Sequence, residues 1–156
     1  MNARIDLFGN AVAGSFVKRL TTASRVFGES TLPLPTQELV KLRASQINGC
    51  GMCTDMHFKD AIAAGEDPVR LNLVAAWKEA TLFTEPERAA LALTEEATRI
   101  ADGGGVREDT WQQVRKHYDE DQIAALIACI ATINAWNRIN VIAGTPAGGY
   151  VAGQFG

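Results

Sequence analysis

The sequence predicts an all-helical fold of seven or eight helices, and three observations support this prediction. Apolar residues recur at intervals of three and four along most of the chain, which is the spacing of one helical face. Residues that start and stop helices separate these segments. Runs that alternate between apolar and polar residues, which would indicate strands, are rare.

The first helix is predicted over residues 7–27, with Gly28 as its stop signal. Its apolar residues at helical spacing are Phe8, Val12, Phe16, Leu20 and Val26. Residues 32–35 read Leu-Pro-Leu-Pro and are expected to form an extended linker, because a residue before proline avoids the helical region. Thr36 is then the expected N-cap of a helix that ends at Asn48-Gly49, with Leu39, Leu42 and Ile47 in one apolar stripe.

The remaining helices also begin and end at recognisable signals. One is expected from about Cys50 to Ala64, and Asp67-Pro68 opens the next, with proline at the first helical position. Residues 84–87 read Thr-Glu-Pro-Glu, a capping box, and start a helix that ends within the glycine-rich residues 101–105. The last two helices are predicted over residues 109–118 and 121–143.

Composition limits the classes of function. A chain of 156 residues suits one domain over residues 1–156 with its own core, and a net charge of −3 argues against nucleic acid and anionic membranes as partners. The N-terminus lacks the uninterrupted apolar stretch of a signal peptide, and the longest apolar run, residues 123–133, is too short to span a membrane. We therefore expect a cytoplasmic protein.

Two of the three cysteines, Cys50 and Cys53, form a Cys-x-x-Cys pair that indicates redox or metal chemistry in a reducing compartment. If Cys50 begins a helix, Cys53 and His57 follow at helical offsets on the same face. The helix N-terminus favours a thiolate, and a neighbouring histidine can accept a thiol proton. A reactive thiolate with a second thiol one turn away can attack an O–O or S–S bond and resolve the product as a disulfide.

Glu38 lies on the preceding predicted helix. A tight connection at Asn48-Gly49 would fold that helix back against the cysteine helix, where Glu38 could orient His57 or serve as the final base.

Glu38, Cys50, Cys53 and His57, at these spacings, resemble the active-site motif of the AhpD-like alkylhydroperoxidases of the carboxymuconolactone decarboxylase superfamily. The resemblance covers roughly residues 36–142. Further segments that carry it are Leu71–Trp77, Phe83–Thr94 and Ile133–Ile139.

The resemblance implies a compact helical bundle, a trimer or a multiple of one, and a thiol peroxidase or disulfide reductase that uses neither metal nor flavin. Cys53 would be the peroxidatic residue, and Cys50 would protonate the leaving group and then close the disulfide. His57 would relay the proton from Cys53 toward Glu38. The substrate would be a hydroperoxide or a disulfide, and the electron donor a dithiol on a lipoylated or thioredoxin-like protein.

One residue departs from this pattern. The best-known members of the family carry a second histidine just before the second cysteine, where this chain has Met52. Methionine cannot move protons, which predicts weak peroxidase turnover and favours general disulfide exchange.

Two alternatives remain open from the sequence. The superfamily includes lactone decarboxylases, although that reaction needs a general acid and base rather than a dithiol. Alternatively, a non-catalytic helical module could bind metal through the cysteines, His57 and Glu38. Cys129 lies in an apolar run and is expected in the core, and Asn137 and Arg138 receive no role although they could approach the site.

Overall fold

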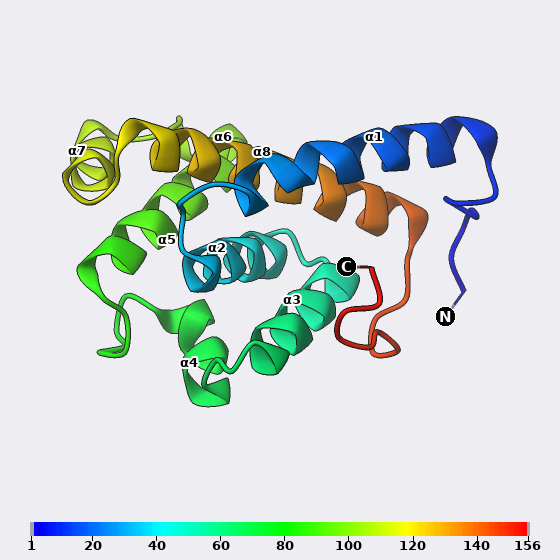
Figure 1. The fold of residues 1–156 in the computed structure, drawn as a ribbon, viewed down its shortest axis with the longest axis horizontal. Coiled ribbons are helices and arrows are strands. Elements are labelled where there is room, and N and C mark those ends of the chain that lie inside the picture. The colour runs from blue at the N-terminus through cyan, green and yellow to red at the C-terminus, as the bar shows by residue number, and fades with distance from the viewer. Residues whose placement is uncertain (1, 156) are drawn as a thin grey trace.

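The computed structural model describes residues 2–155, which contain eight α-helices, one short 3₁₀ helix and no strand (Figure 1). The predicted all-helical fold is confirmed. In chain order, the helices are α1 Ala11–Gly28, α2 Leu34–Ile47, α3 Gly51–Ala63, α4 Pro68–Leu73, η1 Val74–Ala76, α5 Glu85–Thr98, α6 Ile100–Gly103, α7 Glu108–His117 and α8 Glu120–Ala143.

The long helices α1 and α8 lie side by side in opposite directions along one edge of the molecule (Figure 1). Helix α2 packs against α8 from below and has α3 and α5 as its other neighbours. After α8 the chain turns back, and its C-terminal tail, residues 144–155, lies beside α3 (Figure 1).

Residues 36–40, more than one full turn of α2, are all buried, so the middle of the helix has neighbours on every side. Val40 belongs to a core cluster with α5, α7 and α8, whereas Leu39 and Leu42 pack with α3, α4 and α5. Ala44 lies in a third cluster with Cys50, Cys53 and Ile133. The single apolar stripe predicted for α2 was therefore incomplete, because a central helix packs against other helices on all of its faces rather than on one.

The predicted start of α2 was also wrong. Helix α2 begins at Leu34 with Pro33 in the cap position, so residues 32–35 are not an extended linker and Thr36 is not the N-cap. Proline is tolerated in the first helical turn because its missing N–H has no partner there. Thr36 instead lies buried inside the helix.

Helix α1 begins at Ala11 rather than near residue 7. Asn10 is its N-cap, and the side-chain oxygen accepts from the backbone N–H groups of Val12 and Ala13. Most of the apolar residues that predicted this helix do not face the core, since Phe8, Val12, Phe16 and Val26 are all exposed. Val17 and Phe27 make up its buried side instead.

The other predicted signals are close to the observed boundaries. Asp67 caps α4, and Thr84 and Glu87 form the predicted capping box at α5. Helix α5 ends at Thr98, earlier than predicted, and the short α6 follows it. Asp119 caps α8, one residue before its first helical residue.

Helix α8 is longer than the apolar run noted in the sequence. Its 24 residues are long and apolar enough to cross a membrane by length and composition alone. A core helix of a soluble protein passes the same test, and the inward side of α8 packs against α1, α2 and α5.

Leu42→Ala should destabilise the fold, because Leu42 is 1% exposed and lies where α2 meets its neighbours. Truncation of a buried leucine leaves a cavity, and we expect the free energy of unfolding to fall by about 2–5 kcal/mol. Leu34→Ala removes an exposed leucine from the same helix and should change it by less than about 0.5 kcal/mol. Urea unfolding measures both variants, and equal losses would show that α2 is not the centre of the core.

Candidate active site

A tight turn joins α2 to α3 and sets the position of the first cysteine. The backbone N–H of Cys50 donates to the Ser45 carbonyl at 3.0 Å, and Gly49 has a φ of 65°. This six-residue closure with a left-handed residue is a Schellman motif, in which glycine avoids a Cβ clash. The predicted Asn48-Gly49 connection is confirmed, and it directs α3 back along α2.

Cys50 is the N-cap of α3 and lies just outside the helix. Its Sγ accepts from the backbone N–H of Cys53 at 3.4 Å. Both cysteines are reduced, and each is 1% exposed. The two thiols therefore meet at the first turn of a helix, where unpaired backbone N–H groups favour negative charge.

The two sulfurs share their protons unequally. The hydrogen bond from the Cys53 thiol lowers the pKa of Cys50 to about 7, and the backbone N–H of Cys53 assists although burial opposes it. The same hydrogen bond, burial and the charge on Cys50 raise the pKa of Cys53 well above its usual value. The first thiolate of the pair consequently resides on Cys50, and Cys53 donates to it.

Glu38 and His57 form a buried pair between α2 and α3. His57 Nδ1 lies 3.0 Å from Glu38 Oε2, and Lys41 also contacts the Glu38 carboxylate. Burial would raise the pKa of Glu38, but the His57 hydrogen bond and the Lys41 charge lower it to about 2. Since Glu38 is ionised at neutral pH, Nδ1 of His57 carries the hydrogen and donates it.

Burial holds the pKa of His57 below its usual value, and Glu38 only partly opposes this effect. His57 is therefore neutral near pH 7, and its Nε2 can accept a proton. Within residues 2–155, no hydrogen bond joins His57 to either sulfur. The structure thus brings the four predicted residues together as two adjacent pairs.

A small cavity of about 270 Å³ opens beside Glu38. It lies between the start of α2 and the end of α3, and Leu34, Gly65 and Glu66 are among its lining residues. The buried carboxylate therefore has a path to water.

Helix α8 contributes polar residues to which the sequence assigned no role. Asn140 Nδ2 donates to Cys53 Sγ at 3.4 Å, and the Asn137 amide helps to lower the pKa of both thiols. Asn48 at the end of α2 donates to Asn137 Oδ1 and to Asn134 Oδ1. The sequence signal for these residues was the recurrence of asparagine every three residues along α8. This spacing places the asparagines on one side of the helix, but it did not reveal which side of α8 meets α3.

The C-terminal tail lies along α3, from its first turn at Gly51 to Lys59 and Asp60 near its end. Lys59 donates to the carbonyls of Gly148 and Tyr150, and the Tyr150 hydroxyl donates to Asp60. A Cβ added at Gly51 would lie 3.1 Å from the Ala147 Cβ, so the tail rests directly on the residue between the cysteines. Met52, which replaces the expected histidine, packs on the cluster that contains both cysteines.

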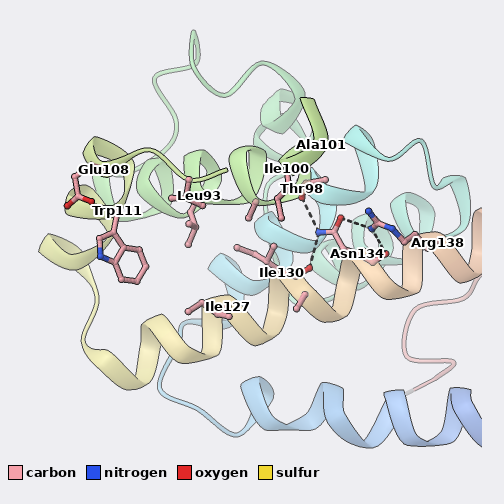
Figure 2. Close-up of a pocket in the computed structure, with 13 residues that line it drawn as sticks. Leu93, Thr98, Ile100, Ala101, Glu108, Trp111, Ile127, Ile130, Asn134 and Arg138 are labelled. Atoms are coloured by element: carbon pink, nitrogen blue, oxygen red, sulfur yellow. Dashed lines mark hydrogen bonds between the residues drawn. The ribbon is translucent and has the colours of Figure 1, made fainter. Parts of the chain in front are cut away.

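A cavity of about 800 Å³ lies away from the cysteines, between α5, α6, α7 and α8 (Figure 2). Its walls are mostly apolar, and Asn134 and Arg138 meet at one end while Glu108 and Trp111 lie at the other (Figure 2). No group of three or more possible metal ligands occurs among the histidines, cysteines and carboxylates of the described chain.

Comparison with known proteins places this geometry in a family. Residues 15–96, which include all four predicted site residues, match the sequence pattern of the Carboxymuconolactone decarboxylase family. The chain belongs to the carboxymuconolactone decarboxylase family. The match ends before α8, so Asn137 and Asn140 lie outside it.

Two similar proteins bear on the place of this chain within the family, and one of them supports an AhpD-like assignment. The uncharacterised protein YdfG of Bacillus subtilis strain 168 is 37% identical over 147 residues, which cover 94% of this chain and 98% of YdfG. The crystal structure of ATU0492 from Agrobacterium tumefaciens, a protein of unknown function proposed to be the antioxidant defence protein AhpD, has 32% identity and a TM-score of 0.88. That similarity covers 96% of this chain and all of ATU0492.

The debrominase Bmp8 shares the fold at lower identity. Its structure has a TM-score of 0.75 and 18% identity, and the similarity covers 88% of this chain and 71% of Bmp8.

Acid should weaken the fold through Glu38. The pKa of Glu38 is lowered from 4.5 to about 2 in the folded protein, so its contribution is full above about pH 4.5 and is lost as pH falls toward 2. Glu38→Gln has no carboxyl group to titrate, so we expect the variant to lack this pH dependence. The difference in the free energy of unfolding between the parent protein and Glu38→Gln should therefore be about 2 kcal/mol smaller at pH 3 than at pH 5. Urea titrations at several pH values measure it, and a constant difference would contradict the Glu38–His57 pairing.

Removal of the Cys53 thiol should make Cys50 a weaker acid. The hydrogen bond from Cys53 is the main reason that the pKa of Cys50 lies at about 7, so Cys53→Ala should shift the pKa toward the usual value of 9.0. Ultraviolet thiolate absorbance followed against pH measures this shift. Cys129→Ala provides the matched control, since Cys129 lies in a different core cluster and should leave the titration near pH 7 in place.

Proposed function

We propose that the protein is a thiol-dependent hydroperoxide and disulfide reductase that cycles Cys50 and Cys53 between dithiol and disulfide. The single observation that carries the proposal is that Cys50 Sγ accepts the backbone N–H of Cys53 at the first turn of α3, with a pKa of about 7 for Cys50. Such a pair is partly ionised at neutral pH, and a thiolate with an adjacent thiol is suited to two-electron reduction.

The unequal pKa values favour Cys53 as the attacking nucleophile and Cys50 as the proton donor. A thiolate of higher pKa is the stronger nucleophile once formed, and a thiol of lower pKa is the better proton donor. As a hydroperoxide reaches the pair, the Cys53 proton moves to Cys50, and Cys53 Sγ attacks the terminal peroxide oxygen. The O–O bond breaks, Cys50 protonates the departing alkoxide, and the products are an alcohol, a sulfenic acid on Cys53 and a thiolate on Cys50.

The second step closes the disulfide. The Cys50 thiolate attacks the Cys53 sulfur, the S–S bond forms, and hydroxide leaves and is protonated to water. The two electrons that reduced the peroxide have then come from the two thiols. An external dithiol of the lipoyl or thioredoxin type, acting in the cytoplasm, returns them by thiol–disulfide exchange.

The Glu38–His57 pair serves as the proton relay when both thiols are protonated and the thiol pair must lose one proton before Cys53 can attack. His57 is neutral and offers Nε2, and Glu38 stabilises positive charge on the ring when it accepts a proton. A bridging water would connect the ring to the thiols. The cavity beside Glu38 supports proton exchange with solvent at the far end of the relay.

A lactone decarboxylase is a weaker proposal for this chain. Decarboxylation could use Glu38 and His57, but it gives no reason for two cysteines at the first turn of one helix. A muconolactone turned over equally well by the Cys50→Ser/Cys53→Ser variant would favour it.

Reduced protein treated with one equivalent of cumene hydroperoxide should lose two thiols rapidly and leave Cys129 unreacted, because Cys129 is buried among apolar residues with a pKa of about 12. Thiol counting with peptide mapping of the disulfide checks this result.

Cys53→Ser should abolish the loss, and Cys129→Ser should leave it unchanged. If all three thiols persist, or if they oxidise no faster than an ordinary exposed cysteine, peroxide reduction is not the activity. Rapid exchange with a model disulfide would then identify disulfide reduction as the remaining part of the proposal.

A further inference from the structure

Helix α8 places two asparagine amides beside the thiol pair, in a stretch that is otherwise apolar where it faces inward. Asn137 and Asn140 are three residues apart and therefore lie on the same side of the helix. Asparagine is a poor helix former and a costly residue to bury, so its amide needs partners. The hydrogen bonds of these two amides show where those partners are.

Asn137 is completely buried, and hydrogen bonds to α2 fix its orientation. Its Oδ1 accepts from Asn48 at 2.9 Å, and its Nδ2 donates to Ser45 Oγ at 3.0 Å. The Ser45 hydroxyl in turn donates to the Lys41 carbonyl at 2.7 Å. This chain of bonds locks α8 against α2 at the level of the cysteines.

Asn140 uses both hydrogens of its amide. Nδ2 donates to the Trp136 carbonyl one turn earlier at 3.1 Å and to Cys53 Sγ at 3.4 Å. The first bond fixes the direction of the amide along the helix, and the second aims an N–H at the sulfur. Cys53 is 1% exposed, so this donor acts where water cannot screen it.

Cys53 needs such a donor more than Cys50 does. Cys50 accepts the backbone N–H at the start of α3, whereas Cys53 lies within the helix and loses that advantage. The hydrogen bond with Cys50 and burial raise the pKa of Cys53, and the amides of Asn137 and Asn140 are the side chains that oppose the rise.

We propose that Asn140 is a further catalytic residue, whose amide N–H stabilises the negative charge on Cys53 Sγ as it becomes the attacking thiolate, with Asn137 as a positioning residue behind it. The inference rests on the proposed Cys50–Cys53 chemistry. Asn140 neither gains nor loses a proton, and the proton from Cys53 still passes to Cys50. A hydrogen bond to an ionised partner is stronger than one to a neutral group, so the amide favours the thiolate over the thiol.

The test isolates Cys53 as the sole thiol in a Cys50→Ser/Cys129→Ser protein. Asn140→Asp keeps the shape but removes the donor and adds a negative charge, and Asn140→Leu removes the donor without charge. We expect the alkylation rate of Cys53 by iodoacetamide at neutral pH to fall by about fivefold in Asn140→Leu and further in Asn140→Asp. When the alkylation rate is measured as a function of pH, the pKa of Cys53 obtained from it should be higher in both Asn140 variants.

Asn72→Leu is the control. Asn72 is an exposed asparagine on α4, so the same substitution is made on a different helix that carries none of the residues of the thiol site. Its replacement should leave the pKa of Cys53 in place. Circular dichroism verifies that each variant is folded before its rate is compared.

The failure of this inference is distinguishable from failure of the proposed function. One outcome is that hydroperoxide oxidises the Cys50–Cys53 pair of the unmodified protein while Cys53 has the same pKa in both Asn140 variants as in the sole-thiol protein that retains Asn140. That result overturns the role of Asn140 and leaves the reductase proposal standing. If the Asn140 variants shift the titration while the intact pair does not react with hydroperoxide or disulfide, the amide contact is supported and the reductase proposal fails.

Discussion

Burial of α2 on every side is the constraint on which the rest of the structure depends. Leu39 and Val40 are adjacent in the chain yet belong to different core clusters, so neighbours must cover the helix all round. In the buried part of such a helix, at residues 36–40 and at Ser45, a polar side chain cannot reach water. Gln37, Glu38 and Ser45 are therefore paired with backbone or side-chain partners, and no buried side-chain nitrogen or oxygen among the described residues lacks a hydrogen bond. The polar groups of the site are part of how the core is closed.

The same constraint shapes the electrostatics around the thiols. The negative charge on Glu38 is balanced by Lys41 and oriented toward His57, whereas the cysteines rely on the end of a helix and on amides. Neutral donors stabilise a thiolate without neutralising it, which preserves its reactivity. Acid–base exchange and sulfur chemistry thus occupy neighbouring pairs: the first is balanced by the charged Lys41, and the second is stabilised by neutral N–H donors.

Much of this arrangement could be predicted from the sequence, and the exceptions have physical causes. Capping residues predicted the starts of α4 and α5 well, because a cap is a local interaction within four residues. The Asn48-Gly49 turn and the spacing of the cysteines also predicted the fold of the motif, including the approach of Glu38 to His57, to which the family resemblance also pointed. The start of α2 was missed because Pro33 and Pro35 suit either an extended segment or a first helical turn. The exposure of Phe8, Val12 and Phe16 and the approach of Asn140 depend on which faces pack together, and periodicity alone does not determine that.

The dependence of the thiol site on α8 also has a consequence for the order in which the protein is made. Glu38, Cys50 and His57 leave the ribosome long before Asn137 and Asn140, because α8 is the last helix of the chain. Domains acquire their tertiary contacts only when the segments that form them have been synthesised. During translation the cysteines emerge without the helix and tail that bury them, and they become shielded only after α8 and the tail have been synthesised. A ribosome stalled before residue 120 would therefore display an open thiol pair that the folded protein encloses.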